Sequence, residues 1–325
     1  MGGRPMKNWI ALCIAIGTTL AAPLLQAQTW PQRPVKVIVP FTAGGNTDTQ
    51  ARIISERLSV ALGQQFIVEN RVGAGGAIAA EFVAKAPADG YTLFFAASSQ
   101  IMIVPLIQKL NYDPLKDFAP ISILGTNPFV LAVHISVPAK TLQDFIDYAK
   151  AHPGELNYSS GGTGSATHLA AALFASRAGL KMSHVPYKGG AQSVTDLVGG
   201  QIQMVLGNAS DMIQHSKSGK IRLLAVSGEK RAPQFPDLPT IAEFYPGFRS
   251  GTWNGFFAPA ATPRTVIDRV AHEVAKAARD PGIIERLNKI GVDALGNTPA
   301  EFAARIRSEA PLWRDAVNAA GIKQE

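Results

Sequence analysis

Short apolar runs and amphipathic stretches alternate along most of the chain. The first run, residues 35–39 (VKVIV), is rich in β-branched residues and precedes Pro40, which is typical of a buried strand. Helical periodicity then continues as far as Leu62, and Gly63 can close that helix. The same pattern predicts a strand at 65–68, a helix at 77–86 and a strand at 91–97. Because strands and helices alternate, we expect a parallel sheet with helices on both faces.

The alternation continues through a middle block and ends in helices. Extended segments are predicted at 121–124, 129–134, 156–159, 184–187, 201–206, 221–226 and 252–258. Helices are predicted at 141–152, up to Gly179 and up to Val198, and two amphipathic helices begin near Thr262 and Thr298. The chain leaves the first block through 129–134 and returns through 252–258. Two crossings predict an α/β protein of two lobes joined by these hinge strands, with residues 28–128 and 255–325 in lobe 1 and residues 129–254 in lobe 2.

Two glycine-rich turns occupy the same place in this pattern, between a strand and the start of a helix. The first is FTAGGNTD (residues 41–48) and the second is SSGGTGS (residues 159–165). At such a turn, backbone N–H groups and the positive end of the helix dipole point at one spot, which suits a small anion. Neither turn has the spacing of a P-loop or a dinucleotide site. Each turn taken alone can also be a plain tight connection.

Three side chains near these turns have two interpretations each. Asp48, like Thr47, can cap the first helix, or it can face a ligand. His168, in the first turn of the helix after the second glycine turn, can orient the loop or act as a general base. Trp253 can belong to the core at the hinge or form a wall of the cleft.

Composition and charge narrow the classes of partner. The chain has 325 residues, enough for two domains, and 46% of them are hydrophobic, which indicates a globular protein. Its formal charge is +7, but the basic residues are scattered singly, whereas a nucleic-acid interface needs a basic cluster. We therefore expect no nucleic acid, and a mildly basic surface that favours small anions.

The first residues have the pattern of an export signal. Arg4 and Lys7 precede an apolar stretch from 9 to 25, and Ala27 offers a cleavage point. Residues 1–27 are thus a predicted signal peptide, with an N-terminal membrane anchor as the alternative. Cys13 is the only cysteine, so the mature chain would have no thiol nucleophile and no cysteine metal ligand. Removing residues 1–27 lowers the formal charge from +7 to +5.

The residues give little support to catalysis or metal binding. Ser165 and His168, with Asp211 or Asp196, could form a hydrolase triad, but the chain has no G-x-S-x-G elbow. The six histidines lack metal-ligand spacing. The sequence therefore predicts no catalytic residue, no metal and no cofactor.

Several segments together resemble one known family. They include VIVPFTAGGNTDTQAR, VENRVGAGGAIAAEFVAKAPADGYTLFFA, YDPLKDFAPIS, NYSSGGTGSATHLA, HVPYKGG, DLVGGQIQM and WNGFFAPAATP, and they span nearly the whole mature chain in order. They are similar to the Bug, or TctC, family of periplasmic solute-binding proteins of tripartite tricarboxylate transporters. The resemblance implies a two-lobed periplasmic binding protein of type II, each lobe a mainly parallel sheet flanked by helices, with the ligand cleft between the lobes.

The resemblance also implies which residues bind the ligand, a small carboxylate held by backbone N–H groups and hydroxyls of the two turns with ordered waters. Ser165 stands where the family often has Thr, and Leu206 and Asn208 stand where Phe and Asp are frequent, which leaves the ligand open. The implied ligand-binding residues are Phe41, Thr42, Ala43, Gly44, Gly45, Asp48, Ser98, Ser99, Ser159, Ser160, Gly161, Gly164, Ser165, His168, Tyr187 and Asn208.

The expected function is that of a monomeric periplasmic binding protein. It would capture a di- or tricarboxylate, an aromatic carboxylate or an amino acid and deliver it to the large and small membrane subunits of a permease. A ligand-reporting partner of a sensor kinase and, less favoured, a serine hydrolase using Ser165 and His168 are the alternatives.

Overall fold

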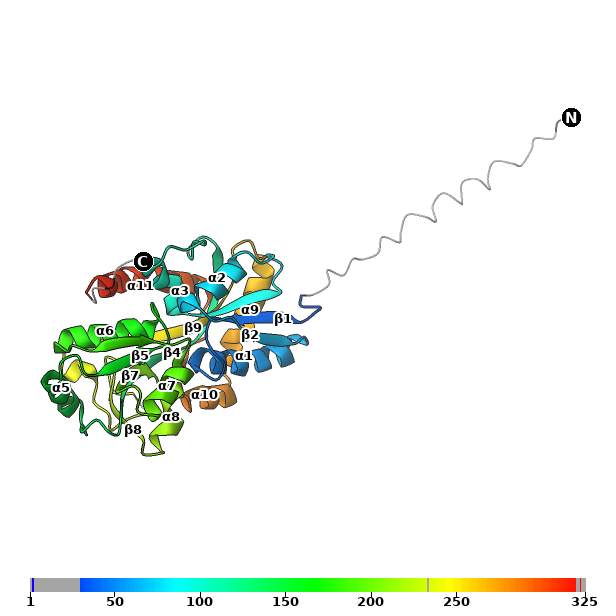
Figure 1. The fold of residues 1–325 in the computed structure, drawn as a ribbon. Coiled ribbons are helices and arrows are strands. Elements are labelled where there is room, and N and C mark those ends of the chain that lie inside the picture. Colours follow the sequence, from blue (N-terminus) through cyan, green and yellow to red (C-terminus); the bar gives the residue numbers. More distant parts are fainter. Residues whose placement is uncertain (1, 3–29, 233, 320–321, 323–325) are drawn as a thin grey trace.

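The computed structural model describes residue 2, residues 30–232 and 234–319, and residue 322 (Figure 1). Apart from residue 2, the predicted signal peptide lies outside the described residues. The described strands join in one continuous sheet in the order β2-β1-β3-β9-β4-β7-β5-β6, with β10 and β8 also paired to β4. β4 (Phe118–His134) runs through the middle of this sheet and links two α/β lobes.

Lobe 1 is built from both ends of the chain. In its sheet, β1 pairs in parallel with β2 and β3, whereas β9 pairs antiparallel with β3 and with the first part of β4. β10 also pairs antiparallel with β4. The bounds are β1 Val35–Val39, β2 Phe66–Asn70, β3 Thr92–Ala97, β9 Gly251–Pro259 and β10 Asp293–Ala294.

Lobe 2 repeats this mixed arrangement. β5 pairs in parallel with β6 and β7, and the second part of β4 pairs antiparallel with β7 and β8. The bounds are β5 Asn157–Ser160, β6 Ser183–Pro186, β7 Met204–Asn208 and β8 Ile221–Val226. The expected parallel pairing thus holds for three strands in each lobe, while the strands at the crossing are antiparallel.

Helices cover both faces of the sheet, as the alternating pattern predicted. In lobe 1 they are α1 Asn46–Leu62, α2 Ala77–Ala84, α3 Ser98–Met102, α4 Val104–Ile107, α9 Arg264–Ala277, α10 Pro281–Asn288 and α11 Pro299–Ala319. In lobe 2 they are α5 Leu142–Ala151, α6 Ala166–Ala178, α7 Gly190–Val198 and α8 Ala209–Ser216. Two 3₁₀ turns, Ala74–Gly76 and Ile241–Glu243, complete the elements.

The two faces of β1 show how the sequence sorts the helices. Val37 and Val39 point to one face, where they join a cluster with residues of α1 and α9. Ile38 points to the other face and joins residues of α2 and α11. Successive strand side chains alternate between faces, so a strand with apolar residues on both faces must be covered on both.

The strand β4 changes partners where it passes between the lobes. Residues 118–128 pair with β9, and residues 129–134 pair with β7 and β8. The two extended segments predicted at 121–124 and 129–134 are therefore parts of one strand. Residues 251–254, which the sequence placed in lobe 2, pair with β3 and the first part of β4 in the sheet of lobe 1. The chain therefore returns to lobe 1 before Gly251.

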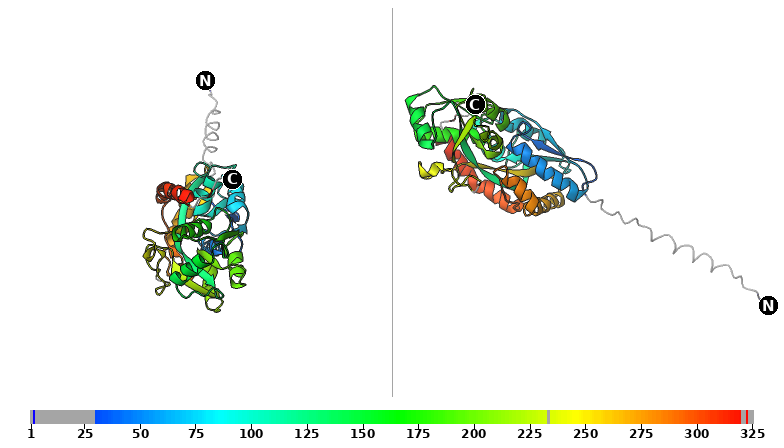
Figure 2. Two further views of the ribbon diagram at one scale, coloured as in Figure 1. Left: turned by 60° about the vertical axis from the view of Figure 1, so that its left-hand side comes forward. Right: turned by 90° about the horizontal axis from the view of Figure 1, so that it is seen from below.

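The C-terminal helix reaches across both lobes. Phe302 and Ile306 of α11 pack in a lobe-1 cluster, whereas Val317 is buried in the main cluster of lobe 2, with Trp313 against it. The orange and red helices lie along one edge of the molecule in Figure 2. Three helices end the fold where the sequence predicted two, since α10 was missed. None of the described helices is long and apolar enough to span a membrane.

Candidate functional site

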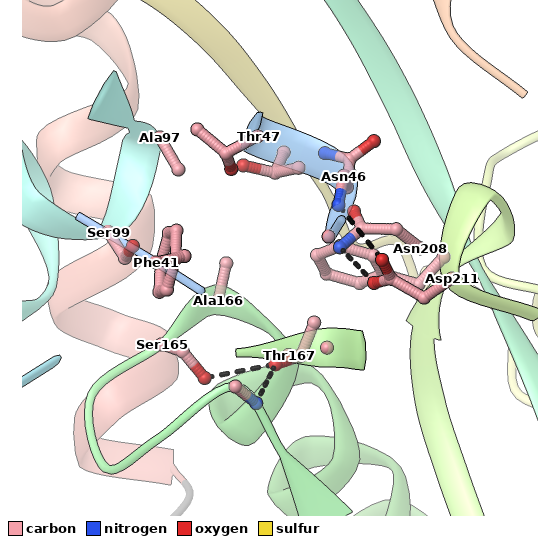
Figure 3. A pocket seen from close by; sticks show the side chains of 15 residues that line it. Phe41, Asn46, Thr47, Ala97, Ser99, Ser165, Ala166, Thr167, Asn208 and Asp211 are labelled. Carbon is pink, nitrogen blue, oxygen red and sulfur yellow. Dashed lines mark hydrogen bonds between the residues drawn. The ribbon is translucent and has the colours of Figure 1, made fainter. Parts of the chain in front are cut away.

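A small cavity lies between the lobes, beyond the carboxyl ends of β1, β3, β5 and β7, where open α/β sheets bind ligands (Figure 3). Its volume is about 40 Å³. One water needs about 10–15 Å³ on this measure, so the space suits a few water-sized atoms or a carboxylate group. Its lining residues are Phe41, Gly45, Asn46, Thr47, Ala97, Ser99, Phe129, Gly161, Ser165, Ala166, Thr167, Gly190, Asn208, Asp211 and Thr252.

The predicted ligand residues divide into two groups. Those that line the cavity are Phe41, Gly45, Ser99, Gly161, Ser165 and Asn208. Those that do not are Thr42, Ala43, Gly44, Asp48, Ser98, Ser159, Ser160, Gly164, His168 and Tyr187. Ser160 and Tyr187 instead line two separate hollows beside the second turn. Prediction missed mainly Asn46, Thr47, Ala166 and Thr167 in the first turns of α1 and α6, and Gly190 and Asp211 at the starts of α7 and α8.

The first turn is organised by Asp48, which does not face the cavity. α1 begins at Asn46 with Gly45 as its N-cap, so the expected cap at Asp48 or Thr47 is wrong. The Asp48 side chain is 2% exposed and forms a two-bond ion pair with Arg52. It also accepts hydrogen bonds from the Gly44 N–H and from Asn70 Nδ2, each at 2.9 Å. Burial acts to raise the pKa of this carboxyl, but these hydrogen bonds and the Arg52 charge outweigh burial and hold the pKa below its usual range.

The second turn is held by its own hydroxyl groups. Ser165 is the N-cap of α6 and accepts the His168 N–H at 3.1 Å. Its Oγ lies 2.9 Å from Oγ1 of Thr167, which accepts the Gly161 N–H at 3.0 Å. Gly164 has a φ of +74° and a β-carbon there would lie 2.5 Å from Ile107, so Gly164 serves packing and turn geometry.

A stacked pair of histidines supports this turn from behind. The rings of His168 and His184 lie 3.8 Å apart, and Tyr158 stacks on His184. His184 Nε2 is 2.7 Å from Ser160 Oγ, and the Gly164 N–H donates to His168 Nδ1 at 3.4 Å. Burial lowers the pKa of His168 to about 4; burial and the neighbouring His168 lower that of His184 to about 3. Both rings are therefore neutral at pH 7.

Ser165 and His168 do not form a serine–histidine dyad. The contact between Ser165 and His168 uses the histidine backbone N–H, while the ring nitrogen Nδ1 faces Gly164. A general base needs a ring nitrogen within hydrogen-bond reach of the nucleophile. The described residues also include no group of three or more side chains suited to hold a metal ion.

The cavity contains one carboxylate, that of Asp211 on α8. Its Oδ1 accepts the backbone N–H of Asn46, and its Oδ2 accepts from Asn208 Nδ2 at 3.3 Å. Burial raises the pKa of Asp211 to about 6, against the opposing effect of these two donors. Asn208 must donate to a carboxylate, so its Oδ1 is the acceptor for Asn127 Nδ2, 2.6 Å away.

Several donors in the cavity have no acceptor among the described residues. Ser99 Oγ and Asn46 Nδ2 are buried without a partner, on residues that are 1% and 3% exposed. The first-turn amides of Thr47, Ala166 and Thr167 are also without an acceptor, as helix geometry predicts. Buried polar groups normally find a partner, so this set indicates a site for an acceptor-rich guest.

Trp253 lies in the core of lobe 1 and does not line the cavity. It is 1% exposed, and its Nε1 donates to Glu309 of α11 at 3.0 Å. Of its two interpretations, core residue and cleft wall, the first is correct.

Comparison with known proteins identifies the family. Residues 50–321 match the model of the tripartite tricarboxylate transporter family receptor, TctC. BugT of Bordetella pertussis is 35% identical over 313 residues, which cover 95% of this chain and 96% of BugT. A protein from the tcbD–tcbE intergenic region of Pseudomonas sp. strain P51 is 37% identical over 316 residues, 97% of this chain and 93% of that protein.

Solved structures agree with these sequence matches. An R. palustris protein solved with adipate has a TM-score of 0.90 at 36% identity, covering 91% of this chain and 100% of that chain. MatC from Rhodopseudomonas palustris, solved with bound malate, has a TM-score of 0.84 at 32% identity, covering 89% of this chain and 100% of MatC. The periplasmic binding protein BugD has a TM-score of 0.87 at 32% identity, with 91% and 100% covered.

The expected α/β fold of a periplasmic binding protein is therefore confirmed. The resemblance noted in the sequence is confirmed as well. This chain belongs to the TctC family of tripartite tricarboxylate transporter receptors, the Bug-type solute-binding proteins.

Proposed function

We propose that the protein binds a small organic carboxylate in the cavity between its lobes and delivers it to a tripartite tricarboxylate-type permease. The observation that carries this proposal is the set of unpartnered donors, Ser99 Oγ, Asn46 Nδ2 and the first-turn amides of α1 and α6. A carboxylate offers about four acceptor sites in a plane, which matches a cavity of about 40 Å³. The adipate and malate held by two relatives belong to the same ligand class.

Closure of the lobes around the ligand would give the permease a distinct conformation to recognise. The donors come from both lobes, Asn46 and Ser99 from lobe 1 and Ala166 and Thr167 from lobe 2. A ligand that contacts both lobes shifts the population toward the closed form. The lobes already touch beside the cavity, where the Thr42 N–H donates to the Lys188 carbonyl at 3.2 Å.

A thermal-shift screen tests carboxylate binding. Malate, adipate and other small carboxylates should raise the melting temperature, and the matching amides should not. Ser99→Ala should lower the affinity for a ligand identified in this screen by about 2- to 10-fold, since the substitution removes one hydrogen bond. Ser308→Ala, which changes an exposed serine on α11, is the control and should leave affinity unchanged. Equal shifts by acids and amides would contradict an anion site.

A transport assay distinguishes delivery of the ligand to a permease from ligand reporting to a sensor kinase. Vesicles that contain the cognate large and small membrane subunits should take up radiolabelled ligand only when the purified protein is added. Uptake without the protein would contradict the delivery role. A ligand-dependent rise in kinase autophosphorylation, without uptake, would support the alternative.

Export to the periplasm is part of the same proposal. Arg4, Lys7 and the apolar residues up to Leu25 support cleavage near Ala27. Amino-terminal sequencing of periplasmic protein should begin within a few residues of Gln28. A periplasmic protein that still begins at Met1 would contradict it.

We also infer that the protein is not a serine hydrolase. The position of the Ser165 hydroxyl beside Thr167, with the His168 ring turned to Gly164, supports this inference. A chromogenic ester should be hydrolysed at the same background rate by wild type and by Ser165→Ala. A rate that falls on substitution would reverse the inference.

A further inference from the structure

The carboxylate of Asp211 lies where the starts of three helices meet. Asp211 is the third residue of α8, its Oδ1 accepts the N–H of Asn46 at the start of α1, and α7 begins beside it at Gly190. A β-carbon at Gly190 would overlap Asp211 Oδ2, so the carboxylate is in close contact with that helix start. Helix N-termini favour negative charge, and here that charge is supplied by the protein.

This arrangement changes the role expected for the first glycine turn in binding the ligand. Two helix starts, α1 and α6, were expected to converge on one ligand anion. The first amide of α1 is instead bonded to Asp211. α1 keeps the unpartnered amide of Thr47, whereas α6 keeps those of both Ala166 and Thr167. Ser165 and Thr167 also line the cavity, so the α6 turn is the better place for a ligand carboxylate.

The polar groups also differ from one side of the cavity to the other. Figure 3 shows Ser99 and Ser165 on one side of the view, with Asp211 and Asn208 on the other. The Ser99 hydroxyl is buried and unpartnered, which is a second observation independent of the helix ends. Asp211 has used two of its roughly four acceptor positions, so it can accept further hydrogen bonds but offers none when ionised.

We propose that Asp211 makes the cavity selective for an amino carboxylate, whose carboxylate lies against the α6 turn and whose ammonium group faces Asp211. This inference rests on the proposed carboxylate-binding function and narrows its ligand class. A second carboxylate in place of the ammonium would face Asp211 and be repelled. An ammonium there makes charge-assisted hydrogen bonds, the stronger kind in proteins.

Matched pairs of linear ligands test the proposal. The pairs are succinate with 4-aminobutyrate, glutarate with 5-aminopentanoate, and adipate with 6-aminohexanoate, which differ only at one end. Titration calorimetry is done at pH 8, where Asp211 is ionised because its pKa is about 6. For the best-fitting length, wild type should bind the amino acid about 10- to 100-fold more tightly than the diacid, the worth of one charge-assisted hydrogen bond.

Two variants of Asp211 give the decisive comparison. Asp211→Asn removes the charge and keeps an acceptor for Asn46, and Asp211→Ser provides a second variant should the first be unstable. In either variant the preference should disappear or reverse in favour of the diacid. Asp147→Asn, which removes an exposed carboxylate of α5, is the matched control and should keep the wild-type preference.

The outcomes separate the inference from the proposed function. Tighter binding of diacids by wild type, with the same order in Asp211→Asn, overturns the inference alone and leaves carboxylate binding intact. An amino-acid preference that survives in both Asp211 variants overturns it too. Binding of neither member of any pair, together with no response to carboxylates in the thermal-shift screen, overturns the proposed function and the inference with it.

Discussion

The backbone N–H of Asn46 in lobe 1 donates to Oδ1 of Asp211 in lobe 2 across 2.9 Å, although 165 positions separate the two residues. Ser210 Oγ reinforces the contact by donating to Asn46 Oδ1 at 3.0 Å. The wall of the cavity and the contact between the lobes are thus made by the same side chains. A change at this point should alter both lobe closure and ligand binding.

Gly190→Ala should weaken ligand binding through Asp211. The added methyl group would overlap Asp211 Oδ2 and displace the carboxylate from Asn46. Losing one charge-assisted hydrogen bond costs about 1.5–3 kcal/mol, so calorimetry should show about 10- to 100-fold lower affinity. Gly199→Ala, at the other end of α7, meets only ordinary contacts and serves as the control. Equal affinities in the two variants would contradict the role of this contact.

Asp211 should make wild type less stable as the pH rises. Its pKa in the folded protein, about 6, is above the usual value of 3.8 because burial disfavours the charge. Its contribution to stability is present below about pH 4 and is lost as the pH rises through 6. The melting temperature of Asp211→Asn relative to wild type should therefore increase between pH 4 and pH 7. A difference that stays constant over this range would contradict the raised pKa.

Asp48→Ala should lower stability far more than affinity. The substitution removes the ion-pair partner of Arg52 and the acceptor of the Gly44 N–H. It also removes one of the two acceptors of Asn70 Nδ2. Because Arg52 is half exposed, we expect a loss of about 2–3 kcal/mol, below that of a fully buried pair. Chemical denaturation gives the stability and calorimetry the affinity, which should change by less than about fivefold. A large loss of affinity at unchanged stability would mean that Asp48 contacts the ligand.

The two turn glycines should respond differently to alanine. Gly45 has a φ of −80°, and an added β-carbon would lie 3.5 Å from the Thr42 carbonyl, so Gly45→Ala should fold normally. It lines the cavity, and the methyl group should reduce ligand affinity. Gly164→Ala should instead lower stability by about 1–3 kcal/mol, because of its positive φ and the clash with Ile107. Denaturation and titration of both variants compare these effects, and equal losses of stability would contradict the distinction.

The histidine pair should destabilise the protein in acid. The pKa values of about 4 and 3 in the folded state are below the usual 6.5, so folding favours the neutral rings. Their contribution is present above about pH 6.5 and is lost as the pH falls toward 4. The melting temperature of His184→Gln should fall less steeply than that of wild type over this range. His215→Gln, an exposed histidine on α8, should keep the wild-type slope, and a wild-type slope in His184→Gln would count against the buried pair.

The sequence predicted the elements whose signals are local. The segment VKVIV predicted β1 because every side chain in it except Lys36 is β-branched and apolar, and residues 65–68 were predicted as the next strand. Residue type and position left Ser165 and Thr167 as the two candidate caps of α6, and Ser165 is the N-cap. Helices α3, α4, α8 and α10 were missed, because each is eight residues or shorter and so spans little more than two turns of a helical pattern.

The parts of the site that were missed depend on how the lobes meet. Asp211 drew attention only as a possible triad member, and nothing in ASDM indicates that it will reach the start of α1. Asp48 is a residue type that favours helix caps, yet its side chain bonds to Arg52 and Asn70, and Gly45 is the N-cap. Asn46 could have been found, since Asn just ahead of an amphipathic stretch is a signal for the start of a helix.

The position of β9 makes completion of the lobe-1 sheet depend on a late part of the chain. β9 lies between β3 and β4, so residues 251–259 must insert between two strands that precede them by more than a hundred positions. Lobe 2 has all its named strands by Val226, whereas lobe 1 lacks a central strand until the last quarter of the chain arrives. A nascent or translocating chain can therefore complete the lobe-2 sheet first, and lobe 1 closes around a late strand.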